Sequence, residues 1–292
     1  MTVIEQTLFK RRMARRKLQG RLFHAICLLA ILIGLGMLAT LLFNVISQGW
    51  DRVNWSFITN FPSRHPEQAG IHAALLGTAY VVSMAGVIAF VVGVASAIYL
   101  EEYATRNWSA RIIQINIANL AGVPSIVYGI LGLAIFVRYM ALGKSVIAGS
   151  LTLALLILPI IIIAAQEAIR AVPPSIREGG YALGANRWQV IWHLVLPQAF
   201  SGIMTGVILS VSRAVGETAP LIVMGALTFV PFAPDSPLSR FTVLPIQIFN
   251  WISRPQAGFH EAASAGIIVL LIMLLSMNAL AVLLRNKFQK GS

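Results

Sequence analysis

Two charged residues stand inside an otherwise apolar segment in the second half of the chain. Arg213 and Glu217 lie in the run RAVGETAPLI, which ends at Ile222. A spacing of four places both side chains on one face of a helix, where they can form an ion pair. Each charge within a membrane span costs about 2.5–3.5 kcal/mol on insertion scales, so such groups usually face a bundle interior or a water-filled path. A purely structural salt bridge and a functional pair are both open at this point.

The neighbours of the pair favour a functional role. Glycine and proline weaken a helix, and a weakened helix can free backbone groups to line a cavity. The planar guanidinium of an arginine suits a tetrahedral oxyanion, because its fork of N–H donors matches such groups. We therefore predict that Arg213, Glu217 and Thr218 belong to a substrate pathway, and that Gly216 and Pro220 shape it.

The composition places these residues in a membrane protein. The chain has 292 residues, of which 58% are hydrophobic and 11% are charged. An average soluble domain has about 25% charged residues. These figures exclude a disordered protein and an ordinary water-soluble enzyme, since 32 charged side chains cannot cover a soluble globule of this size.

Six membrane spans are predicted from stretches with few or no Asp, Glu, Lys or Arg, which makes the chain an all-α, polytopic membrane protein. A helix needs about 20 apolar residues to cross the hydrocarbon core. The first apolar segment is too long for a signal peptide, so we expect it to stay uncleaved. The predicted spans are 22–46, 72–99, 112–137, 146–167, 200–229 and 262–284.

The basic residues predict the orientation of these spans. Fifteen of the 22 basic residues fall in the two termini and in the loops after the second and fourth spans, six fall on the opposite side, and Arg213 is left within a span. The positive-inside rule then places both termini in the cytoplasm. The net charge of +12 is therefore a topology signal and not an indication of nucleic acid. Contact of the basic tail with anionic membrane lipids is a plausible secondary role.

The cytoplasmic segment 166–200 has a predicted structure of its own. Ser175 and Glu178 have the spacing of a capping box, so a short helix is expected to begin there. Gly184 offers a stop or a tight turn. A second helix follows with one apolar stripe. A docking element for a cytosolic partner and a loop lying on the membrane surface both fit this pattern. The stripe contains Trp188, Ile191, Trp192, Val195 and Leu196.

The spacing in the 166–200 loop resembles the coupling loop of ABC importer permeases, whose pattern is E-A-A-x3-G-x9-I-x-L-P. The chain keeps the glutamate, the central glycine and the closing Leu-Pro, but has glycine at both alanine positions and Leu194 for the isoleucine. Glycines weaken a helix by about 1 kcal/mol each relative to alanine. For Glu178, helix capping and direct partner contact remain alternatives. The residues predicted to couple to an ATPase are Ser175, Glu178, Gly184, Trp188, Leu194, Leu196 and Pro197.

Four further runs resemble the permeases of high-affinity phosphate ABC importers. They are GIHAALLGT at 70–78, AIYLEEYA at 97–104, NLAGVPSIVYGILG at 119–132 and the span-five run RAVGETAPL. Together with the loop they cover about 70–285. The variant of AIYLEEYA, the basic tail and the length favour the PstA-type subunit over its PstC-type partner.

This resemblance implies a type I ABC importer permease fold in the bacterial cytoplasmic (inner) membrane. It also implies a heterodimer with a PstC-type permease, a homodimer of ATP-binding subunits, and a periplasmic or lipid-anchored phosphate-binding protein that delivers inorganic phosphate. In the family the span-five arginine and glutamate are associated with transport, and they match Arg213 and Glu217. Pro124 and Ser125 are expected either to shape the pathway or to serve only helix packing.

The resemblance also divides the chain. The expected parts are a basic tail (1–21), a first span with an outer loop (22–71), a permease core (72–285) and a short C-terminal tail (286–292).

Three other functions remain as alternatives. A permease for another oxyanion or nutrient would share the loop, an ion-coupled transporter would not need it, and a membrane enzyme would need a reactive centre. The chain has no phosphate-binding loop of the G-x4-G-K-[ST] type, so any ATP would be bound by a partner. None of its five histidines lies at metal-ligand spacing from another His or Cys, and its only aspartates are Asp51 and Asp235. No catalytic residue, metal site or cofactor is therefore predicted.

Overall fold

The structure is a computed structural model that describes residues 3–104, 107–226 and 228–289. These residues form helices and connecting loops, with one isolated β-bridge between Ser145 and Arg240. Among them, five helices are long and apolar enough to cross a membrane, and one bent helix pair provides a sixth crossing if it counts as a single span. The prediction of an all-α, multi-pass membrane protein is confirmed.

The long helices agree with the predicted spans, apart from the third and the fifth. They are α1 (Val3–Gly49), α3 (His72–Ile98), α6 (Val146–Arg170), α9 (Leu196–Gly216) and α12 (Ala257–Gln289). Shorter α-helices connect them: α2 (Trp55–Thr59), α4 (Trp108–Ala121), α5 (Ser125–Gly132), α7 (Pro174–Ala182), α8 (Arg187–Val190), α10 (Ala219–Val223) and α11 (Leu244–Ile252). Short 3-10 turns occupy Trp50–Arg52 and Pro66–Gln68, and π-helical turns occupy Tyr99–Tyr103, Leu133–Tyr139 and Ile191–Val195.

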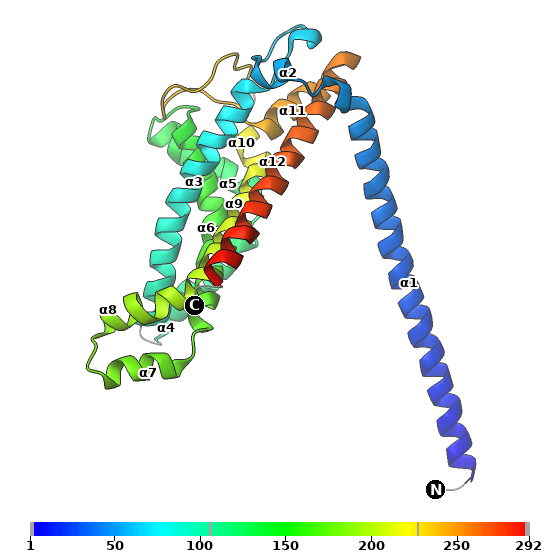
Figure 1. Cartoon of the computed structure of the whole chain (residues 1–292), viewed down its shortest axis with the longest axis vertical. Coiled ribbons are helices and arrows are strands. Elements are labelled where there is room, and N and C mark those ends of the chain that lie inside the picture. The colour runs from blue at the N-terminus through cyan, green and yellow to red at the C-terminus, as the bar shows by residue number, and fades with distance from the viewer. Residues whose placement is uncertain (1–2, 105–106, 227, 290–292) are drawn as a thin grey trace.

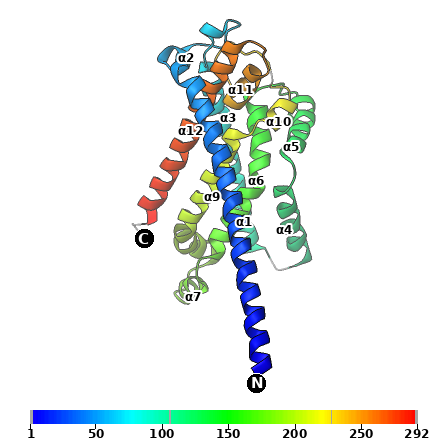
Figure 2. The same cartoon turned by 90° about the vertical axis from the view of Figure 1, so that its right-hand side faces the viewer.

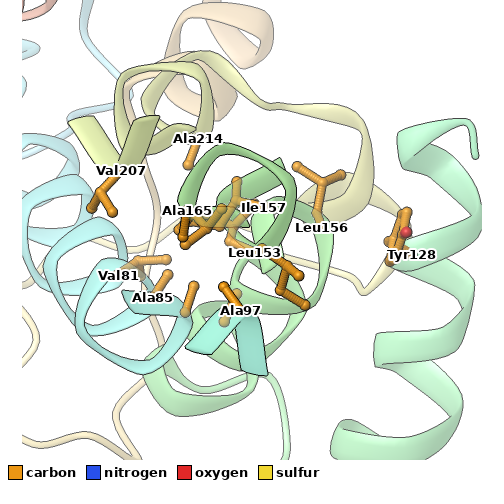
Figure 3. Close-up of a cluster of buried hydrophobic side chains, with 14 of the residues drawn as sticks. Val81, Ala85, Ala97, Tyr128, Leu153, Leu156, Ile157, Ala165, Val207 and Ala214 are labelled. Atoms are coloured by element: carbon orange, nitrogen blue, oxygen red, sulfur yellow. The ribbon is translucent and has the colours of Figure 1, made fainter. Parts of the chain in front are cut away.

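The main hydrophobic core lies among α3, α6 and α9. Figure 3 shows Val81 and Ala85 of α3 facing Leu153 and Ile157 of α6, with Val207 of α9 on the neighbouring side. Small residues let the helices approach closely, as is usual in membranes. A Cβ on Gly202 would lie 2.8 Å from the Cβ of Ala168, so these two positions fix the spacing of α9 and α6. The second, fourth and fifth predicted spans therefore pack against one another as a single unit.

The predicted third span, 112–137, is bent by 103° between α4 and α5. Pro124 precedes the first residue of α5, and proline disfavours helical backbone in the residue before it. The Tyr128 hydroxyl reaches back across the bend and donates to the Leu120 carbonyl over 2.8 Å. The Leu120 carbonyl also accepts the backbone N–H of Val123 over 3.1 Å, so the hydroxyl adds a second bond that holds the bend. Figure 2 shows α4 and α5 one above the other at an edge of the bundle.

A second hydrophobic cluster closes the end of the bundle opposite α7 and α8. Trp251 of α11 lies at its centre, together with Phe57 and Phe259. The Thr78 hydroxyl of α3 accepts the backbone N–H of Leu244 over 2.9 Å and holds the start of α11 against the core. The segment 231–261, whose shape the sequence leaves open, therefore contains a buried stretch at 241–248 between two more exposed parts.

The exposed part of that segment contains a local carboxylate interaction. The Ser239 hydroxyl donates to Asp235, and this bond lowers the pKa of the Asp235 carboxyl below its ordinary value, with backbone N–H groups acting in the same direction. Asp235 is therefore held as an anion on the loop surface.

Helix α1 stands apart from the bundle along most of its length (Figure 1). It joins the rest near Gly49, where a Cβ would lie 2.6 Å from the backbone nitrogen of Ala265 in α12. Its apolar side chains are otherwise exposed in the single chain, so lipid or another subunit must cover them. The far ends of α1 and α12 lie at the end of the molecule that carries α7 and α8 (Figure 1).

Candidate functional site

The helix that carries Arg213 ends immediately after it. Helix α9 stops at Gly216, Glu217 has extended backbone angles (φ −75°, ψ 122°), and α10 begins at Ala219. The predicted span 200–229 is therefore divided into two helices at the position where a weak helix is expected. The reason lies in the sequence, since Gly216 costs about 1 kcal/mol relative to alanine and Pro220 in the first turn of α10 cannot continue a helix across the break.

Arg213 and Glu217 form the predicted ion pair across this helix end. Arg213 Nε lies 3.2 Å from Glu217 Oε1. The two side chains do not share one helical face, because Glu217 lies beyond the last turn; its backbone N–H donates to the Ala214 carbonyl over 3.2 Å and folds the chain back. The pair is confirmed, and its helical geometry is corrected.

The exposure of the pair is unequal. The Arg213 side chain is 53% exposed and that of Glu217 is 16% exposed. The described residues offer no partner to Arg213 Nη1 or Nη2, since its one ion pair uses Nε. An arginine binds oxyanions best through two parallel N–H donors. Nη1 and Nη2 of this guanidinium can therefore donate to an oxyanion while Nε stays bonded to Glu217.

Thr218 and Pro220 order the chain after the break. The Thr218 carbonyl accepts the N–H of Ile222 over 3.0 Å, and its hydroxyl donates to the Gly216 carbonyl over 3.3 Å. Pro220 is buried against α5, where a Cβ on Gly129 would lie 2.7 Å from the Pro220 Cα. The break after α9 thus packs on the helix that follows the bend in the third span.

Pro124 and Ser125 lie at that bend and not beside the charged pair. Pro124 directly precedes α5 and Ser125 is its first residue. Among the described residues neither has a hydrogen bond or ion pair to Arg213 or Glu217. They determine the direction of the helix on which Pro220 packs.

A polar bond that the sequence did not reveal holds the end of α9. The Ser212 hydroxyl donates to the Asn278 side-chain carbonyl of α12 over 2.7 Å. The two residues are 66 positions apart, so no local spacing could have indicated the bond. It fixes the turn that carries Arg213 against α12.

The 166–200 loop contains the two predicted helices, but its caps differ from the prediction. Helix α7 begins at Pro174 with Pro173 at its N-cap position and no side-chain cap bond, so the Ser175–Glu178 capping box is wrong. Proline is pre-organised for the first helical position and starts α7 before Ser175 can cap it. A reciprocal box exists instead at α8, where Asn186 and Gln189 exchange two bonds of 2.9 Å.

Gly184 makes the turn between α7 and α8, as predicted. Its φ of +80° lies in the left-handed region that glycine adopts without strain. Glu178 is exposed on α7, which leaves it open to a partner contact. On the other side of α7, a Cβ on Gly180 would lie 2.7 Å from Leu194 Cδ1 and 2.9 Å from Val190 Cγ2, so this glycine lets the two helices approach closely.

The predicted apolar stripe of the second helix is divided between two environments. Ile191 and Val195 are buried, and Leu194 and Leu196 are partly buried against the same core. Trp188 and Trp192 are instead exposed and stack on each other, with ring centroids 5.4 Å apart and planes at 14°. The apolar stripe therefore packs on the core through its aliphatic residues and leaves its two tryptophans on the surface.

Proline also explains the irregular part of this helix. Pro197 lies in the first turn of α9, directly after the π-helical turn Ile191–Val195. A π-turn changes the hydrogen-bond register where the proline has no N–H to donate. The run Arg187–Gly216 thereby continues for 30 residues from the loop to the charged pair.

The class of protein follows from the fold, the Arg213–Glu217 pair at the end of α9 and the two helices of the 166–200 loop. Residues 89–290 match the family described as binding-protein-dependent transport system inner membrane component, and the chain belongs to this family. Residues 10–58 also match a domain of unknown function (DUF3333). The class is thus a transport permease, which agrees with a non-enzymatic transport subunit.

The chain is similar over nearly its whole length to permeases of known name. It is 33% identical over 291 residues to the phosphate transport system permease protein PstA 1 of Mycobacterium tuberculosis, covering 97% of this chain and 93% of that protein. It is 32% identical over 274 residues to the PstA protein of Yersinia pestis, covering 93% and 92%. The predicted resemblance to PstA-type permeases is confirmed.

Solved structures show the same fold at lower identity. An amino acid ABC transporter with histidines matches 73% of this chain and 92% of its own, with a TM-score of 0.57 and 19% identity. The MetNI methionine ABC transporter, in an inward-facing conformation, matches 73% and 93%, with a TM-score of 0.59 and 14% identity. The predicted ABC importer permease fold is confirmed.

Proposed function

We propose that this chain is the membrane-spanning permease subunit of an ATP-driven, high-affinity importer of inorganic phosphate in the bacterial inner membrane. It pairs with a PstC-type permease to form the pathway, and a periplasmic or lipid-anchored binding protein delivers phosphate. A homodimer of ATP-binding subunits drives transport, and the chain itself binds no cofactor. The similarity to two PstA proteins supports phosphate as the substrate.

One structural observation carries this proposal: a half-exposed arginine with two unpaired nitrogens lies at a break in a membrane span. A charged side chain within a membrane span is costly unless it faces a polar path. Glu217 neutralises Arg213 when the path is empty. When phosphate arrives, its oxygens bind Nη1 and Nη2, and Thr218 lies directly after the pair with its hydroxyl bonded to the Gly216 carbonyl.

The 166–200 loop supplies the connection to the ATPase. Helices α7 and α8 lie at one end of the bundle, the same end of the molecule at which α1 begins and α12 finishes (Figure 1). Trp188 of α8 is exposed there, together with Trp192. The excess of basic residues at this end supports a cytoplasmic position, where ATP is available. Gly184, Glu178 and Trp188 are the surface residues through which the ATPase binds.

The test is uptake of labelled phosphate by the complete complex in proteoliposomes, with its binding protein outside and ATP inside. We expect uptake that requires ATP and that unlabelled phosphate inhibits but sulfate does not. Preferential inhibition by sulfate or another oxyanion would assign that anion as the substrate. Uptake that persists without the ATPase subunits but follows an ion gradient would refute the ABC mechanism.

A further inference from the structure

A buried ion pair joins the 166–200 loop to the end of α3. Arg177 of α7 lies 75 residues from Glu102, which belongs to the π-helical turn at the end of α3. Both Arg177 Nη2 and Nε donate to Glu102 Oε1, over 2.8 Å and 3.1 Å. The Glu102 side chain is only 7% exposed and that of Arg177 is 21% exposed. The pair is therefore shielded from water and held by two charge-assisted bonds.

The same guanidinium also binds the end of α6. Arg177 Nη1 donates to the Val172 carbonyl over 2.7 Å, and Nη2 donates to the Ile169 carbonyl over 2.9 Å. The Ile169 carbonyl lies in the last turn of α6 and also accepts the backbone N–H of Val172, which follows the helix, so Arg177 binds the chain where α6 ends. One side chain thus connects three elements: α7, the end of α6 and the end of α3.

The rest of α7 packs mainly on its own loop. Gly180 lies against Val190 and Leu194, which belong to the second helix of the same loop. Helix α3, by contrast, is part of the central core with α6 and α9 (Figure 3). The second helix of the loop also contacts the π-helical turn at the end of α3, since Arg187 lies over the Tyr103 ring, 5.1 Å from its centroid. Helix α7 itself is joined to the end of α3 by the ion pair of Arg177 with Glu102.

A neighbouring ion pair provides a contrast. Glu101 accepts bonds from Arg170 and Gln166, which both belong to α6, and Arg170 also binds Glu167. The Glu101 side chain is 15% exposed but that of Arg170 is 55% exposed, so water competes for this pair. Glu101 and Glu102 are adjacent in the sequence, yet of these two it is Glu102 that binds α7.

We infer that Arg177 and Glu102 are positioning residues that pass the movement of the ATPase-binding loop to α3. This inference rests on the proposed function, because it requires an ATPase that moves α7. The pair acts as a rigid connection, since all the donors and acceptors named above are satisfied in a poorly hydrated place. Loss of this ion pair should let the ATPase hydrolyse ATP without moving α3.

The test compares Glu102→Gln with Glu101→Gln in the complete complex in proteoliposomes. Phosphate uptake and ATP hydrolysis are measured in the same vesicles, and their ratio is the readout. For Glu102→Gln we expect ATP hydrolysis within about twofold of wild type and at least a tenfold lower ratio. For Glu101→Gln we expect both values within about twofold of wild type. Arg177→Lys keeps the charge but loses the planar fork, so its ratio should fall between those of wild type and Arg177→Gln.

Two outcomes would overturn the inference. One is an unchanged ratio in both Glu102→Gln and Arg177→Gln. The other is a loss of uptake and ATP hydrolysis in equal proportion together with poor assembly, which indicates a structural role only. If Glu102→Gln does not assemble, Arg177→Lys decides between these outcomes.

A second measurement separates this inference from the choice of substrate. Spin labels at Val87 of α3 and Leu275 of α12, both exposed, report the position of α3 in a Cys27→Ser background. We expect ATP with vanadate to change their distance in the wild-type complex but not in Glu102→Gln. If the wild-type complex transports no phosphate, but ATP with vanadate changes the label distance in wild type and not in Glu102→Gln, then phosphate is refuted as the substrate and the Arg177–Glu102 connection stands. The same distance change in both proteins would refute the connection.

Discussion

The 30-residue helical run Arg187–Gly216 ends in two contrasting ways. At its first end Asn186 and Gln189 satisfy each other, and Val190 is buried against Gly180. At its last end the Arg213 side chain is half exposed. There the helix stops at Gly216, where an added Cβ would meet no atom within 4 Å. The polar groups at the first end satisfy each other, and although Trp188 is exposed we call this the packed end. At the last end Arg213 keeps unpaired donors, and although Ala214 and Val215 are buried we call this the open end.

The difference separates two tasks on one helix. A packed end with satisfied polar groups moves as a unit, so it suits transmission of force from a partner. An open end with unpaired donors can exchange an internal partner for a ligand, so it suits substrate passage. The ion pairs follow the same division, since Arg177–Glu102 is enclosed and long-range whereas Arg213–Glu217 is local and accessible.

The largest effect should come from removing the unpaired N–H donors of Arg213. Arg213→Gln removes charged hydrogen bonds of about 1.5–3 kcal/mol, which corresponds to about a 10- to 100-fold loss of phosphate uptake. Assembly should be unchanged, because the Arg213 side chain is half exposed and its ion pair with Glu217 is local. Labelled-phosphate uptake at matched expression measures the effect, and Arg213→Lys should retain more activity. Normal phosphate uptake by Arg213→Gln would contradict the claim that the end of α9 serves substrate passage.

A smaller effect is expected from straining the loop turn. Gly184→Val forces a β-branched residue into a left-handed conformation, which costs about 1–2 kcal/mol. We expect about tenfold weaker ATPase binding, measured by titration of the ATPase subunits onto the permeases. Gly143→Val is the matched control, since Gly143 has a φ of +64° and equally open surroundings but lies outside the 166–200 loop. Equal effects of both variants on ATPase binding would contradict a docking role for the Gly184 turn.

The smallest effect tests the packing of α7. Gly179→Ala should stabilise the loop by up to about 1 kcal/mol, because a Cβ there meets no atom within 4 Å. Gly180→Ala gains the same helix propensity but pushes on Leu194 and Val190, so its net change should be near zero or unfavourable. Thermal unfolding of the detergent-solubilised permease compares the two variants. Equal stabilisation would show that the packed end tolerates more volume than its geometry indicates.

Much of the fold could be predicted because membrane insertion acts on local sequence. Charge-free stretches fixed the spans, and Gly216 and Pro220 correctly indicated a weak helix beside Arg213. Local patterns failed where two signals competed, as at Ser175, where the preceding prolines determine the start of α7. The Glu102–Arg177 pair could not be predicted, because contacts across 75 residues depend on how the helices pack.

The central claim is that the break after Gly216 opens onto a water-filled path, and cysteine accessibility tests it most directly. Gly216→Cys is made in a Cys27→Ser background, which removes the single native cysteine. The account predicts that a charged, membrane-impermeant thiol reagent modifies this cysteine in the complete complex. Leu209→Cys, an exposed apolar position earlier in α9, should remain unmodified. Protection of Gly216→Cys from the reagent, or equal modification of both cysteines, would contradict the account.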